Sequence, residues 1–167
     1  MRLISTLDPD RQVPGQLALF AFDADLPRLV AGPWDALGIA DGTAASANGN
    51  RTRDPRHPYG DHPCGYYAIT GLIATSKREP ERRRFGPGRF VLMPVRGQCL
   101  VSARNGRYGL LIHGGDPGKF SKLRATYGCL RISNDAMSTL MELWHESRFT
   151  SYRCYENGDF IYDGETP

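Results

Sequence analysis

The sequence predicts a mainly β fold with one or two helices, organised as a single domain. Nineteen glycines and twelve prolines among 167 residues indicate many turns and irregular connections rather than a helical bundle. Short apolar runs bounded by turn residues recur along the chain, as expected of strands. Helical spacing of apolar residues is clear only after residue 133, so we expect one well-defined helix there.

The composition is that of an ordinary globular protein. Hydrophobic residues make up 40% and charged residues 23%, and a chain of this length can bury a sizeable core. The formal net charge of +3 suits an anionic polymer but gives no argument for a nucleic-acid partner. No run of eighteen apolar residues occurs, so we expect no membrane span.

The first part of the chain predicts a β-hairpin. Residues 1–15 are expected to form a polar lead-in, and residues 16–167 a single catalytic domain. Gln16–Asp23 is a short apolar run that favours a strand, and Arg28–Ala31 is its expected antiparallel partner. Trp34–Ile39 is too short to classify.

A long polar segment, Asp41–Pro63, is rich in Gly, Asn, Asp, Arg and Pro and predicts a loop. Loops of this length in compact domains tend to be functional or disordered. His57, Asp61 and His62 within it suggest a metal site, but their spacing matches no usual ligand pattern. We therefore expect solvated loop histidines, no metal and no cofactor.

The middle of the chain begins with a charge run, Lys77–Arg84, which predicts an exposed turn. The alternative is an anion-attracting rim beside a cleft. Phe90–Val95 and Cys99–Ala103 are expected to be strands. Asn105-Gly106 predicts a hairpin turn, after which Tyr108–Ile112 would return as the partner strand.

The last part of the chain predicts a helix followed by a hairpin. Ser133 or Asn134 can cap the helix. Its apolar stripe, which we expect to pack on the sheet, consists of Met137, Leu140, Met141 and Trp144. Ser151–Tyr155 and Phe160–Tyr162 are expected to form the final hairpin.

The chain has four cysteines, Cys64, Cys99, Cys129 and Cys154. Their spacing defines no disulfide framework and no zinc motif. Bridges between Cys99 and Cys154, or between Cys64 and Cys99, are conceivable. We expect free, buried thiols instead.

One histidine and one cysteine stand out because each adjoins glycine at the end of an apolar segment. His113 precedes Gly114-Gly115, and Cys129 follows Gly128 sixteen positions later. An imidazole can take a thiol proton, and glycines allow backbone amides to approach a developing oxyanion. The alternative is that Cys129 is a small buried apolar residue and His113 a hydrogen-bonded core histidine.

The arrangement His-Gly-Gly, a connector and then Thr-x-Gly-Cys-Leu-Arg resembles the active-site signature of the L,D-transpeptidase catalytic-domain (YkuD) family. By this resemblance, His113 is the general base and Cys129 the nucleophile. Thr126 matches the Ser/Thr of the motif, while Tyr127 stands where many members have a second histidine. The resemblance implies a YkuD-like β-sandwich.

The same resemblance suggests oxyanion and substrate-binding roles for Gly114, Thr126, Tyr127, Gly128 and Arg131. Backbone amides around the cysteine are the expected oxyanion donors. The arginine could bind a substrate carboxylate through two hydrogen bonds, or could form a surface ion pair. The histidine is expected to form a thiolate–imidazolium pair with the cysteine.

The activity implied by the resemblance is cysteine-dependent modification of peptidoglycan stem peptides. The thiolate would attack the meso-diaminopimelate–D-Ala bond of a tetrapeptide and form a thioester. An amine from a second stem, water or a D-amino acid would then release it, giving transpeptidase, carboxypeptidase or exchange activity. The alternatives are a catalytically inert cell-wall-binding module of the same fold and a papain-like NlpC/P60 peptidase.

The first fifteen residues lack the apolar core and cleavage site of a Sec signal peptide. An enzyme of this kind would act in the periplasm or cell wall. Either the sequence is a trimmed form, or the protein reaches the cell wall by another route, such as type VI secretion of an antibacterial effector. An effector would require an immunity protein in the producing cell.

Overall fold

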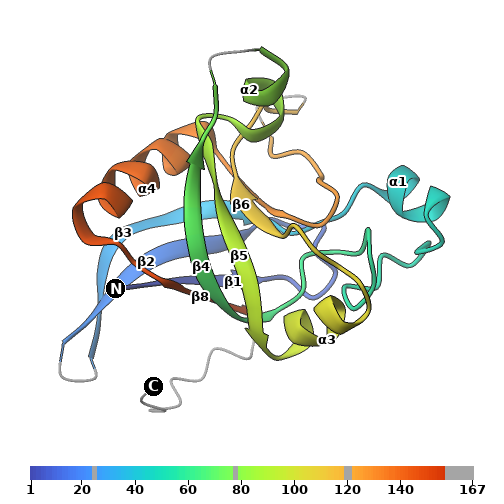
Figure 1. Ribbon diagram of the computed structural model, residues 1–167, viewed down its shortest axis with the longest axis horizontal. Helices are drawn as coiled ribbons and strands as arrows, with labels where there is room; N and C mark the ends of the chain where they lie inside the picture. The colour runs from blue at the N-terminus through green and yellow to red at the C-terminus, as the bar shows by residue number, and fades with distance from the viewer. Residues whose placement is uncertain (24–25, 77–78, 119–121, 157–167) are drawn as a thin grey trace.

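The computed structural model describes residues 1–23, 26–76, 79–118 and 122–156. Within these ranges, eight strands close into one barrel with the order β1-β2-β3-β7-β6-β5-β4-β8 (Figure 1). The strands are β1 (Arg2–Leu7), β2 (Gly15–Asp23), β3 (Leu26–Leu37), β4 (Gly65–Ala74), β5 (Gly88–Arg96), β6 (Leu111–His113), β7 (Leu130–Ile132) and β8 (Ser151–Glu156). The helices are α1 (Gly42–Ala47), α2 (Glu79–Phe85), α3 (Gln98–Arg104) and α4 (Asn134–Ser147).

The barrel is closed by β8, which pairs in parallel with β1 and antiparallel with β4. The pair β6–β7 is also parallel, whereas the remaining neighbours are antiparallel. A β-sandwich has two separate sheets, each with its own edge strands. The predicted YkuD-like β-sandwich is therefore wrong: the strands form a single closed mixed barrel.

The N-terminal segment is part of the barrel and not a polar lead-in. Strand β1 lies within residues 1–15 and pairs with both β2 and β8. Leu3, Ser5 and Leu7 all point into the interior and are at most 1% exposed. The predicted hairpin is confirmed as β2–β3, and β3 extends to Leu37.

The segment Cys99–Ala103 is helical, so the predicted strand is wrong. It lies in α3, whose C-cap is Asn105. Gly106 follows with a φ of +82°, a conformation that glycine adopts without steric cost. The Asn-Gly dipeptide thus ends a helix here instead of forming a hairpin turn.

The long segment Asp41–Pro63 is not entirely loop, because it contains α1. The Asp41 side chain caps this helix by accepting a hydrogen bond from the Ala44 amide at 2.8 Å.

Further along, β6 is shorter than predicted but does end at His113. Among the described residues, no helix combines the length and apolar character needed to cross a bilayer.

The predicted C-terminal helix is confirmed as α4, with Ser133 as its N-cap. The predicted strand that follows it is confirmed as β8. The other half of the expected hairpin, Phe160–Tyr162, lies outside the described residues.

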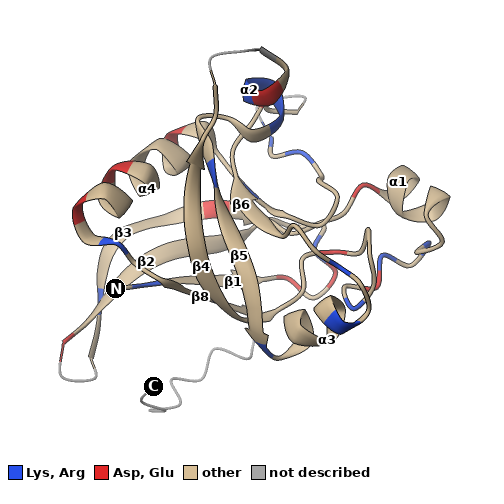
Figure 2. Ribbon diagram, in the orientation of Figure 1, with Lys and Arg blue, Asp and Glu red and all other residues tan. Residues whose placement is uncertain are grey.

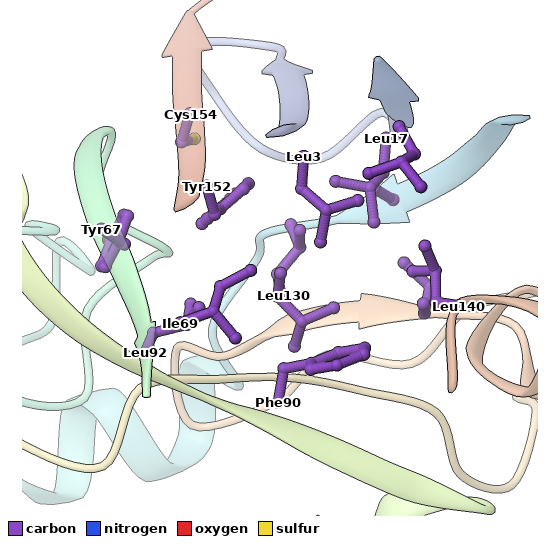
Figure 3. Packing of buried hydrophobic residues seen from close by; sticks show 14 of the residues in the cluster. Leu3, Leu17, Tyr67, Ile69, Phe90, Leu92, Leu130, Leu140, Tyr152 and Cys154 are labelled. Carbon is purple, nitrogen blue, oxygen red and sulfur yellow. The ribbon is translucent and has the colours of Figure 1, made fainter. Parts of the chain in front are cut away.

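The core fills the barrel interior and the contact with α4 (Figure 3). Phe90 is fully buried, and its ring centroid lies 5.4 Å from that of Trp144 and 5.4 Å from that of Phe149. Residues from all eight strands and from α4 share this cluster, among them Leu3, Leu17, Ala36, Ile69, Phe90, Ile112, Leu130, Leu140 and Tyr152.

All four cysteines are free thiols, as predicted. Cys99 is buried and directs its sulfur at the backbone carbonyls of Tyr66 and Arg96. Cys64 and Cys154 lie next to each other, with their sulfur atoms 2.8 Å apart. Neither of the two disulfides considered from the sequence, Cys99–Cys154 and Cys64–Cys99, joins this pair.

Replacing Phe90 with alanine should lower the free energy of unfolding by about 3–5 kcal/mol, because it opens a cavity between β5, α4 and Phe149. Urea denaturation measures the change. The control is Leu26→Ala at a side chain that is 72% exposed, where we expect a change within about 0.5 kcal/mol. A loss below about 1 kcal/mol for the Phe90 variant would contradict this packing.

Candidate active site

The parallel pair β6–β7 brings His113 and Cys129 to the same face of the barrel wall. Ile112 pairs with Leu130, and Cys129 directly precedes that residue. Continuing the register places Cys129 beside Leu111, and His113 lies two residues further along the same strand. Residues two apart on a strand share a face. Both side chains line one cavity of about 810 Å³.

The His113 ring is oriented by a backbone carbonyl. Its Nδ1 lies 2.7 Å from the carbonyl oxygen of Gly114. A carbonyl only accepts, so Nδ1 carries the proton and Nε2 keeps a free lone pair. Burial lowers the pKa of His113 to about 4, with smaller contributions from Arg131 and Arg84. The imidazole is therefore neutral at pH 7.

The Cys129 thiol is half-buried, and its sulfur lies 3.8 Å from the carbonyl oxygen of Gly109. Burial raises the pKa of this thiol, while the Leu111 amide and the charges of Arg107 and Arg84 act in the opposite direction. Thiol and imidazole are thus both neutral at rest. This differs from the thiolate–imidazolium pair expected from the sequence.

The turn that carries the cysteine is held by Thr126. Its hydroxyl accepts a hydrogen bond from the Gly128 amide and donates one to the Cys129 carbonyl, both at 2.9 Å. Its backbone accepts from the Asp41 amide at 2.7 Å and donates to the Ile39 carbonyl at 3.2 Å. Thr126 therefore organises the turn, and it also lines the cavity, so its predicted role in substrate binding stays a prediction.

A buried guanidinium fixes the other side of this turn. Arg107 is only 4% exposed, and its guanidinium binds several backbone carbonyls, that of Gly128 among them. It donates at 2.7 to 3.0 Å to the carbonyl oxygens of Pro55, Gly60, Asp61 and Gly128. A side chain at Gly128, whose φ is +107°, would collide with this guanidinium. Arg107 thus ties the long segment 41–63 to the turn that carries Cys129.

A buried polar chain reaches the same carbonyl from the opposite direction. The Nδ1 of His62 lies 3.1 Å from the Gly128 oxygen, so it donates there. The Tyr152 hydroxyl lies 3.3 Å from Nε2 of His62 and 2.7 Å from the Ser5 hydroxyl. Burial lowers the pKa of His62 to about 3. The ring is therefore neutral, with a fixed tautomer.

The residues considered for a metal site have different surroundings. The Asp61 carboxylate accepts a hydrogen bond from the Ala40 amide at 2.7 Å. The expectation of solvated loop histidines is confirmed for His57, which is exposed, and wrong for His62, which is buried, as is Asp61. Among the described residues, no group of metal-ligating side chains gathers.

The cavity lining is strongly cationic. Its charged residues are Arg83, Arg84, Arg107, Arg124, Arg131 and Asp41. The charge run Lys77–Arg84 contributes the last turn of α2, which carries several of the basic residues (Figure 2). Residues 80–84 are exposed, so the predicted exposed turn is confirmed for them, and the position of Arg83 and Arg84 at the cavity leaves the anion-attracting rim open as well.

The comparisons with known proteins show the fold but no family. No family model and no curated protein matches the sequence. Bd1075 of Bdellovibrio bacteriovorus is similar in structure, with a TM-score of 0.57, 16% identity, and 91% of this chain and 47% of that chain covered. Pgp2, a helical cell shape determining protein from Campylobacter jejuni, has a TM-score of 0.53, 17% identity, and 92% and 46% covered. The chain spans slightly less than half the length of either protein.

Two of the predicted oxyanion donors are used elsewhere. The Gly128 amide binds Thr126, and the Gly114 amide donates to the Phe85 carbonyl at 3.2 Å. Gly114 instead orients His113 through its own carbonyl. The amides of Tyr127 and Cys129 remain predicted donors.

Arg131 is buried and acts within the protein. Its Nη1 lies 3.3 Å from the Arg84 carbonyl oxygen and its Nη2 lies 2.6 Å from the Asp116 carbonyl oxygen. These two contacts dock α2 and the segment after His113 onto β7. The guanidinium is therefore already engaged, and carboxylate binding by Arg131 stays a prediction without support from its surroundings.

Sequence reasoning missed Arg107, His62 and the position of Arg84. An isolated arginine after an Asn-Gly pair gives no local sign of burial. His62 precedes Pro63 in a polar segment, which favours exposure. The basic run around Arg84 was visible, but its place at the cavity depends on how α2 docks.

We expect alkylation of Cys129 by iodoacetamide to follow a pKa above the ordinary cysteine value, because the resting thiol is neutral. Quantitative mass spectrometry of the Cys129 peptide between about pH 5 and pH 10 measures the rate. A rate that is already maximal near neutral pH would indicate the ion pair and contradict the neutral resting state.

Arg107→Met provides the variant for this measurement, since loss of its charge should raise the pKa of Cys129 further. Arg107→Lys keeps the charge and should bring the profile back toward the wild type. Identical profiles for all three proteins would show that Arg107 does not act on the thiol.

Proposed function

We propose that this protein is a cysteine-dependent acyl-transfer enzyme that acts on peptidoglycan stem peptides, at the meso-diaminopimelate–D-Ala bond. The observation that carries the proposal is the single cavity shared by His113 and Cys129. Within it, the Gly114 carbonyl fixes the imidazole with Nε2 as the free acceptor. A neutral thiol that attacks a carbonyl needs a base to take its proton, and a free lone pair on Nε2 in the same cavity supports this role for His113.

The reaction begins when the Cys129 sulfur attacks the carbonyl carbon of the scissile amide. Its proton moves to Nε2 of His113, and the negative charge on the carbonyl oxygen is stabilised by backbone amides of the nucleophile turn. The C–N bond then breaks, the leaving D-Ala amine takes the proton from His113, and a thioester remains. Water, an amine of a second stem or a free D-amino acid finally attacks the thioester and restores the thiol.

The choice of substrate rests on charge and on likeness. The cavity lining carries five arginines and one aspartate, which favours a ligand with carboxylates such as a stem peptide. The structurally similar Pgp2 is named for its role in cell shape, and bacterial shape depends on the wall. The motif from His113 to Arg131 adds the resemblance to L,D-transpeptidases.

The papain-like alternative fits the site less well. NlpC/P60 enzymes place the cysteine at a helix N-terminus with the histidine later in the chain. Here, Cys129 precedes a strand, β7, and His113 comes earlier in the sequence. The inert wall-binding module remains the contrasting hypothesis, and turnover separates it from the enzyme.

Incubation with purified disaccharide tetrapeptide, followed by mass spectrometry, tests the activity. We expect the wild type to yield tripeptide, cross-linked dimer or an exchanged terminal residue, depending on the acceptor. Cys129→Ala should abolish every product because no thioester can form. His113→Gln should lower the rate by about 10²- to 10⁴-fold, the usual contribution of a general base.

The matched control is Cys64→Ala, since Cys64 is a free thiol with burial similar to that of Cys129. It should leave the product pattern unchanged. Unaltered tetrapeptide with the folded wild-type protein would refute the enzyme and leave the inert module.

We further propose that the enzyme acts in the periplasm as a secreted antibacterial effector and that an immunity protein neutralises it in the producing cell. Expression in Escherichia coli with an added Sec signal should slow growth or lyse the cells, whereas expression without the signal should not. Periplasmic Cys129→Ala should be harmless. Equal harmlessness of the active enzyme in both compartments would contradict the effector role.

A further inference from the structure

We propose that Arg84 is the main contact for the terminal α-carboxylate of the substrate peptide, assisted by Arg124. The inference rests on the proposed function and names the part of the substrate that the site reads. With this contact, the substrates are peptides that have a free C-terminal carboxylate, and internal peptide bonds are excluded as substrates.

The end of α2 is attached to the strands that carry the catalytic pair. The Phe85 carbonyl accepts from the Gly114 amide at 3.2 Å, and the Arg83 carbonyl accepts from the Asp116 amide at 2.7 Å. The Arg84 carbonyl lies 3.3 Å from Nη1 of Arg131 in β7. Three consecutive carbonyls of α2 are therefore held, and the Arg84 side chain has a fixed starting point at the cavity.

The Arg84 guanidinium lies between aromatic rings of the cavity wall. Its Cζ atom is 5.1 Å from the ring centroid of Phe85 and 5.9 Å from that of Tyr127. Stacking on an aromatic face restricts the guanidinium while leaving its N–H groups available in their own plane. Tyr127 is two residues before Cys129, so this restriction acts close to the nucleophile.

The charge of Arg84 is not neutralised by the protein. Within the described ranges, Arg84 has no carboxylate partner, whereas Arg83 pairs with Asp116 at 2.9 Å. Asp41 is the acidic residue of the cavity lining, and its carboxylate is engaged as the cap of α1. Arg124 lines the same cavity. The cavity therefore offers two guanidinium groups to an incoming anion.

A substrate carboxylate beside the scissile bond provides the anionic partner for the guanidinium groups of Arg84 and Arg124. In a C-terminal residue, the α-carboxylate is separated from the scissile carbonyl only by the amide nitrogen and one carbon atom. An arginine can bind it through two parallel charge-assisted hydrogen bonds. An internal peptide bond would present a neutral amide at this position and leave the cation without its partner.

Binding of two peptides to Cys129→Ala tests the inference, because binding is measured without turnover. The peptides are the tetrapeptide stem ending in D-Ala and the same stem ending in D-alaninamide, and isothermal calorimetry gives both affinities. We expect the free acid to bind at least roughly tenfold more tightly, the ratio expected for a charge-assisted contact.

Adding Arg84→Gln to the same background should bring that ratio close to one, and Arg124→Gln should reduce it less. Arg82→Gln is the control, since Arg82 is an exposed arginine of the same helix that does not line the cavity. It removes the same charge and should leave the ratio unchanged.

Equal affinities for acid and amide, or no binding of either, would overturn the carboxylate site. A ratio that falls equally in the Arg84 and Arg82 variants would assign the preference to general charge and would overturn it as well. Turnover of tetrapeptide by the wild type is a separate readout. Turnover with equal affinities would therefore support the enzymatic activity and contradict the carboxylate site. A higher affinity for the free acid without turnover would contradict only the enzymatic activity.

Discussion

The contact between Arg107 and the carbonyl of Gly128 is the constraint on which the site depends. Burying a guanidinium is costly unless its donors are satisfied, and here four backbone carbonyls at 3.0 Å or less provide that compensation. Three of these carbonyls belong to the segment 41–63 and the fourth to the turn that carries Cys129. One side chain thus holds a long irregular segment and this turn together.

The same contact explains why the turn needs glycine at position 128. The carbonyl of Gly128 is bound from two sides, by Arg107 and by His62, and its amide is bound by Thr126. With both backbone groups engaged and a φ of +107°, the residue has no space for a side chain. The position of Cys129, the next residue, follows from this arrangement.

The local signals in the sequence singled out His113 and Cys129, which line one cavity, but did not predict the fold around them. His113 and Cys129 adjoin glycines at the ends of apolar segments, and such features are visible in a single sequence. Barrel closure depends on pairing β1 with β8, strands almost 150 residues apart, and no local pattern encodes a parallel partner. Burial of Arg107 is equally non-local, because its acceptors are backbone carbonyls and not particular side chains.

The arginines around the cavity have opposite effects on the charged forms of Cys129 and His113. Their positive charge favours the thiolate of Cys129 but disfavours the imidazolium of His113, so it does not create an ion pair at rest. A carboxylate bound at Arg84 would offset part of this charge. The imidazolium would then become easier to form at the moment when substrate is present. In the proposed mechanism, carboxylate recognition and proton transfer would thus be coupled through one electrostatic field, and the thiol would stay protonated until a substrate arrives.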